Sequence, residues 1–181
     1  MTTETRAEEE QKIKRLALHP LMRNLNHTQL ALLADCALTA HFKAGEVIFR
    51  EGEPADRFYL IQNGKVVLES GEGYGEPVII ETIGAGDLLG WSWMMPPYMW
   101  HFTARAVAAT EAVYFHGPIL HQYCERDHSL GFELHKRMSE VMMKRLQAAR
   151  KKMLSLHAHG EKLEPAIGLP PYVEQELDTC D

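Results

Sequence analysis

This sequence is poor in cysteine and has no long hydrophobic run, and each deficit excludes a class of protein. Its three cysteines, Cys36, Cys124 and Cys180, are odd in number and widely spaced, so they predict neither a disulfide framework nor a zinc site. No apolar run approaches the ~20 residues of a membrane span. Residues 1–10 are acidic and polar, whereas a signal peptide would be basic and then apolar. We therefore expect a cytoplasmic protein that makes no membrane contact.

Basic residues are also scarce relative to acidic ones. The chain has 19 Lys and Arg against 25 Asp and Glu, a net charge of -6, which gives it no general attraction for nucleic acid. Hydrophobic residues make up 45% of the 181 residues, enough for one packed globular domain. The 10 histidines do not repeat at a metal-ligand spacing, so we expect no metal site.

The apolar spacing of residues 8–40 predicts two helices. Pro20 must separate them, because a proline inside a helix removes a backbone donor and clashes with the preceding turn. Asn26 or Thr28 can cap the second helix by offering a side-chain oxygen to its free amides. The N-terminal region is therefore expected to be helical as far as residue 40.

From residue 42 to about residue 115 the hydrophobic period changes to two, which predicts a β domain. The predicted strands are residues 46–50, 57–62, 65–69, 78–83, 102–108 and 111–115. The dipeptide Asn63-Gly64 lies between two of them, and it readily takes the positive φ angles of a tight hairpin turn. Short strands with turn residues between them are typical of a sandwich or barrel.

A long helix is predicted after the β domain, from about residue 129 to residue 158. Five apolar residues at alternating spacings of four and three lie on one stripe of this helix: Met142, Leu146, Ala149, Met153 and Leu156. The stripe favours a homodimer through residues 129–157, the alternative being that it packs on the chain's own β domain. The predicted division is an N-terminal helical extension (1–18), the β domain (19–128), a dimerisation helix (129–159) and an acidic, proline-containing tail (160–181).

Three stretches of the sequence together resemble the cyclic nucleotide-binding domain of the catabolite activator and Fnr superfamily. They are FKAGEVIFREGEPADRFYLIQNGKVVLES, IGAGDLLG and TARAVAATEAVYF. The resemblance implies a mainly β fold with flanking helices: an eight-stranded β-roll, or jelly roll, with N-terminal helices and a long C-terminal helix. Transcription factors of the family carry a helix-turn-helix after the long helix, but segment 160–181 is acidic and proline-rich. We therefore expect a stand-alone form without direct DNA binding.

The resemblance also implies a phosphate-binding cassette, in which a short helix begins with Gly-Glu and a later arginine holds the cyclic phosphate. Here Gly90 keeps the glycine, Trp91 stands where the glutamate is expected, and Trp100 or His101 falls near the expected arginine. The absence of both anchors argues against ordinary cyclic AMP or cyclic GMP binding, because an unpaired buried phosphate costs several kcal/mol. Arg105, on the following strand, is a substitute cation if it faces the ligand.

Two hypotheses follow for this altered cassette. In the first, the protein is a sensor that binds a nucleotide-type ligand, such as a cyclic nucleotide or cyclic dinucleotide, because flat aromatic faces stack bases and a histidine can hydrogen-bond. The predicted ligand-binding residues are Leu89, Gly90, Trp91, Ser92, Trp100, His101, Phe102 and Thr103. In the second, the tryptophans fill the interior themselves, and the domain is a scaffold that binds another protein.

No enzyme is predicted. Cys124 lies three residues after His121, a spacing that could pair a nucleophile with a base on one helical turn. However, no orienting third group or oxyanion motif accompanies the pair. We therefore expect no catalytic residues and no cofactor, and we expect the protein to signal through its dimer helix.

Overall fold

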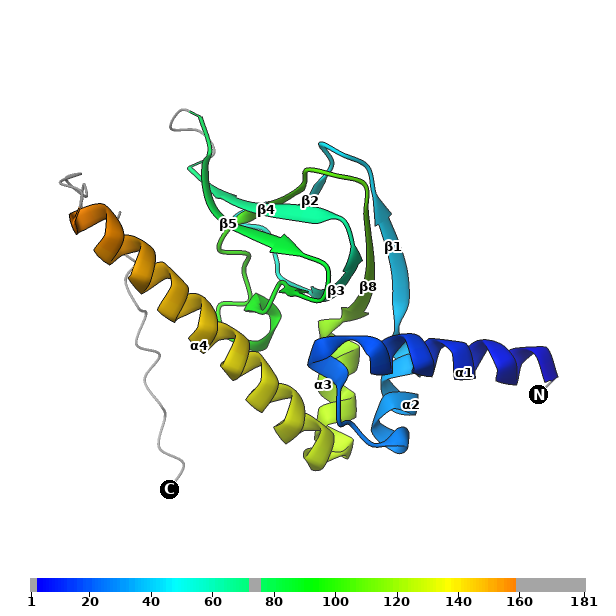
Figure 1. Ribbon diagram of the computed structural model, residues 1–181. Helices are drawn as coiled ribbons and strands as arrows, with labels where there is room; N and C mark the ends of the chain where they lie inside the picture. The colour runs from blue at the N-terminus through cyan, green and yellow to red at the C-terminus, as the bar shows by residue number, and fades with distance from the viewer. Residues whose placement is uncertain (1–2, 72–75, 159–181) are drawn as a thin grey trace, which may run out of the picture. The chain divides into compact units, whose positions relative to one another are not determined.

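The computed structural model describes residues 3–71 and 76–158, and within them the chain forms eight strands in two antiparallel sheets (Figure 1). The first sheet has the order β1-β8-β3-β6 and contains β1 (Leu38–Phe42), β3 (Arg57–Asn63), β6 (Leu88–Leu89) and β8 (Thr110–His116). The second has the order β2-β7-β4-β5 and contains β2 (Val47–Phe49), β4 (Lys65–Ser70), β5 (Val78–Gly84) and β7 (Thr103–Ala106). With the flanking helices, this confirms the predicted mainly β roll.

Alternate residues of both sheets point into one hydrophobic interior, which we call the roll core. Because side chains alternate along a strand, Tyr59 and Ile61 of β3 face this interior while Phe58 and Leu60 face away. The buried members of the roll core are Phe49, Ala55, Tyr59, Ile61, Val66, Leu68, Ile83, Leu89, Trp100, Ala104 and Ala112. The loop between β6 and β7 contributes one of these, Trp100.

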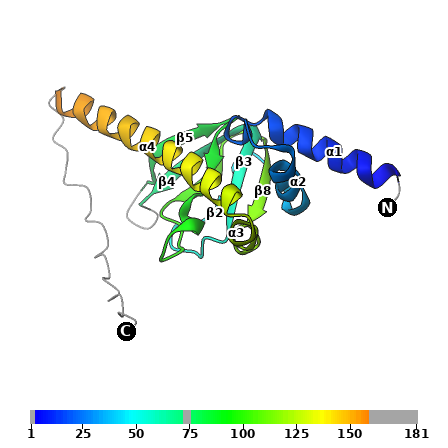
Figure 2. The same cartoon turned by 90° about the horizontal axis from the view of Figure 1, so that it is seen from below.

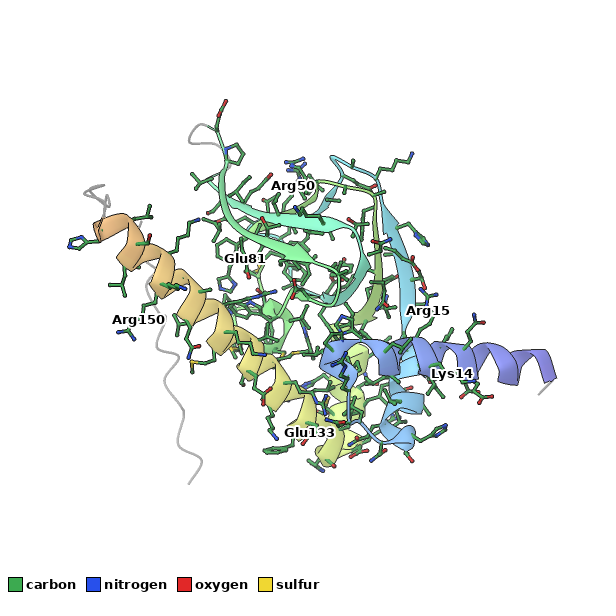
Figure 3. The ribbon with its side chains drawn as sticks, viewed as in Figure 1. Lys14, Arg15, Arg50, Glu81, Glu133 and Arg150 are labelled. Atoms are coloured by element: carbon green, nitrogen blue, oxygen red, sulfur yellow. The ribbon has the colours of Figure 1, made fainter. Side chains whose placement is uncertain are left out.

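Helices cover the other face of the first sheet. They are α1 (Thr3–Leu18), the short 3-10 helix η1 (Pro20–Met22), α2 (His27–Cys36), α3 (Gly117–Arg126) and the part of α4 (His128–Ala158) that precedes residue 140. Both views place α2 beside α3 and α3 below β8 (Figures 1 and 2). Phe58 and Phe115 are fully buried on this face and stack with ring centroids 4.7 Å apart. The side chain of Arg15 extends from α1 to pair with Glu111 on β8 (Figure 3).

The N-terminal helices follow the sequence prediction except at their end. The helix breaks before Pro20, and Asn26 caps α2 by accepting a hydrogen bond from the Gln29 amide at 2.9 Å. The predicted helical region ends too late, because α2 stops at Cys36 and Leu38 begins a strand. The reason is tertiary pairing, since β1 finds a complete antiparallel partner in β8.

The predicted hairpin at Asn63-Gly64 is also corrected. Gly64 has the expected positive φ of 97°, but the strands that it joins pair with other strands, β3 with β6 and β8 and β4 with β5 and β7. A Cβ on Gly64 would lie 2.5 Å from the Ala109 carbonyl oxygen. The turn is therefore pressed against the connection between β7 and β8, and it carries the chain from one sheet to the other.

Helix α4 contributes to two compact units, one ending at Ser139 and the other beginning at Glu140. Its first turns pack in the first unit, where Leu130, Leu134 and Met138 are buried. Arg137 donates hydrogen bonds to the carbonyls of Leu21 at 2.7 Å and Arg23 at 2.5 Å, which fastens the helix to η1. The predicted tail, residues 160–181, lies outside the described residues.

In the second unit, the exposed side of α4 carries part of the predicted stripe. Leu146 and Met153 are each more than half exposed along this helix. Over the described ranges 3–71 and 76–158, the helices lack the length and apolar character needed to cross a membrane.

Candidate functional site

The candidate site is the loop between β6 and β7, residues 90–102, which we call the cassette. It begins at Gly90, whose φ is 84° and whose Cβ, if present, would lie 2.9 Å from the Trp100 ring. Only glycine fits this close approach and this left-handed conformation without strain. After Trp91 the chain forms one short turn of 3-10 helix, η2 (Ser92–Met94), for which Trp91 supplies no side-chain cap.

Trp100 fills the interior of the roll. Its side chain is 5% exposed, and its ring stacks on Phe49 with a centroid separation of 3.8 Å and an interplanar angle of 12°. Its backbone is fixed as well, because its N–H donates to the Glu53 carbonyl and its carbonyl accepts from the Gly52 N–H, both at 2.8 Å. The ring therefore occupies a defined position between the two sheets.

Trp93 is buried on the opposite face of the first sheet. It is 7% exposed, and its ring lies 5.6 Å from that of Phe58, stacked at 17°. Its Nε1 is buried without a hydrogen-bond partner. Trp93 is therefore part of the packing beneath the helices, as Trp100 is part of the roll core.

The accessible side of the cassette includes the Trp91 and His101 rings, which the buried Ser92 side chain supports from within. The Trp91 ring is half-buried and stacks against the exposed His101 ring, with centroids 5.6 Å apart and an interplanar angle of 20°. The Ser92 hydroxyl is hydrogen-bonded to His101 Nδ1 at 3.1 Å, which holds the imidazole in place. Here a flat ligand ring can stack and hydrogen-bond without unfolding the core.

The structure therefore divides the eight predicted ligand-binding residues into two groups. Trp91 and His101 come together at the accessible side, and the buried Ser92 hydrogen-bonds to His101. The other five residues belong to the packing of the fold. Leu89 and Trp100 are in the roll core, and Phe102 packs against it. Gly90 lies on the Trp100 ring, and the Thr103 hydroxyl accepts a hydrogen bond from the Glu51 amide at 3.1 Å.

Arg105 lies on the outer face of β7. Ala104 belongs to the roll core, so its neighbour Arg105 points the other way. The Arg105 Nε contacts both carboxylate oxygens of Glu69 at 3.2 Å, and a terminal nitrogen donates to the Gly45 carbonyl. Arg105 is thus engaged outside the roll, and no lysine or arginine occurs in residues 88–104.

One residue beside the cassette was missed by the sequence reasoning. Arg57 is on the same face of β3 as Tyr59, and its carbonyl oxygen would lie 3.3 Å from a Cβ on Gly90. Its guanidinium lies over the Tyr114 ring, 5.7 Å from the centroid. The alternation of the predicted strand 57–62 was the available signal, because it puts Arg57 on the face of Tyr59.

The two cysteines among the described residues, Cys36 and Cys124, offer little nucleophilic chemistry. Burial raises the pKa of the Cys36 thiol to about 11, and burial also raises the pKa of Cys124. At neutral pH both are therefore protonated and poorly reactive. In the part of the chain that the structure describes, His, Cys, Asp and Glu residues form no group of three that could hold a metal ion.

Comparison with known proteins identifies the fold. The family model of the cyclic nucleotide-binding domain matches residues 39–127, which run from β1 to the end of α3. Residues 39–127 belong to the cyclic nucleotide-binding domain family. Among curated proteins, this domain is similar to cGMP-dependent protein kinase 2 of Homo sapiens, with 33% identity over 91 residues, covering 50% of this chain and 12% of the kinase.

A second curated relative is the cAMP-dependent protein kinase regulatory subunit of Emericella nidulans, 39% identical over 71 residues, or 39% of this chain and 16% of the subunit. The chain thus matches only a small part of the length of these relatives.

Solved structures share the cyclic nucleotide-binding fold. A putative cyclic nucleotide-binding protein from Geobacter metallireducens is 28% identical with a TM-score of 0.65, covering 74% of this chain and 96% of that one. A cyclic nucleotide-binding domain from Methylobacillus flagellatus has a TM-score of 0.69 at 18% identity, with coverages of 82% and 84%. A regulatory subunit of a cAMP-independent protein kinase A from Trypanosoma cruzi, bound to guanosine, has a TM-score of 0.64 at 19% identity, with coverages of 87% and 52%.

Proposed function

We propose that this chain is a non-catalytic regulatory protein that senses a nucleotide-type ligand at the accessible side of its cassette. The ligand's flat ring stacks with Trp91 and His101, and Ser92 orients the imidazole. In the family that this sequence resembles, a cassette arginine holds the cyclic phosphate inside the roll. This chain lacks that arginine, so cyclic AMP and cyclic GMP are not its ligands. The single observation that carries this proposal is the accessible stack of Trp91 on His101, and the burial of Trp100 against Phe49 excludes the roll interior.

The energetics of Trp100 support this choice. A ligand that entered the roll interior would have to displace the Trp100 ring, and losing a buried tryptophan side chain costs about 3–5 kcal/mol. Since about 1.4 kcal/mol is tenfold in affinity, displacement would weaken binding roughly a hundredfold or more. Phosphate in the interior would in addition meet no cationic side chain from residues 88–104.

The stacking chemistry favours a ligand with a nucleobase, because a base offers a flat face to aromatic rings whatever its substituents. The similar fold from Trypanosoma cruzi, which is bound to guanosine, fits the idea that such a roll can hold a nucleoside. Cyclic dinucleotides, which offer two bases, belong to the same class of candidates.

The protein is proposed to signal through a homodimer formed by residues 129–157, and not by binding DNA. Leu146 and Met153 form an exposed apolar stripe on α4, and a second copy of the same helix would cover it. The low cysteine content fits a cytoplasmic location. A protein partner downstream of the dimer is in keeping with the relatives, which are named as a protein kinase and a kinase regulatory subunit.

A ligand screen tests the proposal. Thermal unfolding would be followed against cyclic mononucleotides, cyclic dinucleotides, mononucleotides and nucleosides. A ligand at about 100 times its dissociation constant adds roughly 2.7 kcal/mol, which raises the melting temperature by several degrees. The response should vanish in Trp91→Ala and persist in Tyr98→Ala, which removes an exposed aromatic ring from the same loop. A response that survives Trp91→Ala contradicts the proposed site.

The second candidate function is a protein-binding scaffold, and the burial of both Trp93 and Trp100 favours it. In that case the rings serve only to fill the fold, and the protein acts by dimerising or by docking a partner. Silence across the whole nucleotide screen would support the scaffold. Any saturable nucleotide response would contradict it.

A further inference from the structure

The roll presents a cation beside the cassette that comes from β3. Arg57 precedes Tyr59 by two residues, so both side chains lie on the inner face of that strand. In the antiparallel register Arg57 is opposite His116 and Tyr59 is opposite Tyr114. These four side chains form a row that leads from the roll core to its end, and Arg57 stands at that end.

Arg57 forms an ion pair with Asp56 and a hydrogen bond with the Tyr59 side chain, and one of its donors is left over. Its Nε is buried without a hydrogen-bond partner, and Asp56 Oδ1 lies 3.6 Å from it, beyond hydrogen-bonding distance. The guanidinium lies over the Tyr114 ring, a contact that holds its plane and leaves the Nε–H donor unsatisfied. The Arg57 side chain is 43% exposed, so it can be reached from solvent.

Two neighbours make this end of the roll favourable for an anion. His116 is the N-cap residue of α3, so the positive end of the α3 dipole lies at the residue paired with Arg57. The Arg57 carbonyl oxygen lies against Gly90, the first residue of the cassette and the one before Trp91. Arg57 therefore adjoins the start of the cassette through its backbone, and residues 88–104 supply no lysine or arginine of their own.

We propose that Arg57 anchors an oxyanion, the carboxylate or phosphate group of the sensed ligand. The planar fork of a guanidinium matches both groups, and each can accept two parallel N–H bonds from it. This inference names the charged group of the ligand proposed above and rests on that proposal. It also assigns the anchoring charge to β3 instead of to the cassette.

Nuclear magnetic resonance of the arginine Nε–H groups tests the anchor on the full chain. The Arg57 signal is identified by its loss in Arg57→Lys. Inorganic phosphate and acetate are titrated separately, at constant ionic strength. A saturable shift of the Arg57 signal with phosphate, with acetate or with both supports the anchor, and the comparison tells which oxyanion it prefers. An unmoved Arg57 signal in both titrations overturns it.

Three variants complete the test, each checked for its unfolding temperature. Arg57→Lys keeps the positive charge but loses the forked donor geometry of the guanidinium, so it should weaken anion binding about tenfold or more. The affinity is measured on those other arginine signals that the anion also shifts. Arg57→Gln should abolish anion binding. Arg23→Gln removes an exposed arginine elsewhere and should bind like the wild type. Unchanged binding in Arg57→Gln overturns the anchor.

The anchor and the proposed function fail in different ways. If a nucleotide raises the melting temperature in a Trp91-dependent way while phosphate and acetate leave the Arg57 signal unmoved, the anchor is overturned and the sensor stands. If Arg57 binds the anions while every nucleotide in the screen is silent, the nucleotide sensor is overturned and the anion site stands.

Discussion

Trp100 closes the interior of the roll, because its ring fills the space between the two sheets. Trp100→Ala should lower the free energy of unfolding by about 3–5 kcal/mol, the cost of emptying a buried tryptophan site. Urea unfolding measures this loss. The matched change Trp91→Ala, at the half-buried ring, should cost much less. Equal losses for the two variants would contradict the division of the cassette into a core part and an accessible part.

His19 makes stability depend on pH. It is 4% exposed, its Nδ1 accepts a hydrogen bond from the Leu21 amide at 3.2 Å, and burial lowers its pKa, although the nearby carbonyls of Asp87 and Ile61 oppose the shift. The unfolded state then binds more protons, so stability is present above the unfolded pKa of about 6.5 and is lost as pH falls through the folded pKa.

The measurement for His19 is the unfolding free energy between pH 8 and pH 5, taken on the wild type and on His19→Asn. The asparagine keeps a side-chain acceptor for the Leu21 amide but does not titrate. We expect the loss of stability on acidification to be smaller in His19→Asn. An identical pH dependence in both proteins would refute the assignment to His19.

At the scale of residues, the sequence predicted that large rings gather in the cassette but not which way each one points. The sequence does not distinguish the three tryptophans from one another. In the structure Trp91 is accessible, whereas Trp93 and Trp100 are buried on opposite faces of the first sheet. Their direction depends on the backbone of an irregular loop, where neither period two nor period 3.6 applies. Arg105 was undecided for a related reason, since the face of a short strand depends on its register.

The α2 helix is held at its start by a reciprocal cap. Asn26 accepts from the Gln29 amide, and the Gln29 side chain accepts from the Asn26 amide at 3.1 Å. Asn26→Ala should therefore cost about 1 kcal/mol, with a fall of about 2–4 °C in melting temperature for a chain of this size. Asn26→Ser, which retains a capping oxygen, is the control. A loss as large in Asn26→Ser as in Asn26→Ala would argue that capping is not the cause.

At the scale of elements, the strands with clear alternation were predicted, and those defined by pairing were not. The strands β3, β4, β5 and β8 lie close to their predicted ranges. By contrast β1 was assigned to a helix, because Leu38 continues an apolar helical spacing and only its pairing with β8 makes it a strand. The two-residue β6 is too short to produce a pattern. The Asn63-Gly64 turn was predicted correctly, whereas its strands pair elsewhere, which local sequence does not determine.

The whole molecule is proposed to be a dimer through α4. Leu146→Glu would place a charge in the apolar stripe and should convert the dimer to a monomer in analytical ultracentrifugation. Gln147→Glu adds the same charge about 100° away around the helix and should leave the dimer intact. If the wild type sediments as a monomer at tens of micromolar concentration, the proposed signalling route through α4 is wrong.

Trp100 fills the interior of this cyclic nucleotide-binding fold, and the proposed function therefore excludes binding of cyclic AMP or cyclic GMP there. Isothermal titration calorimetry of the wild-type chain with each of the two nucleotides tests it most directly. We expect no saturable binding tighter than about 100 µM, which corresponds to less than about 5.5 kcal/mol of binding free energy. A dissociation constant of about 1 µM or below for either nucleotide would contradict it.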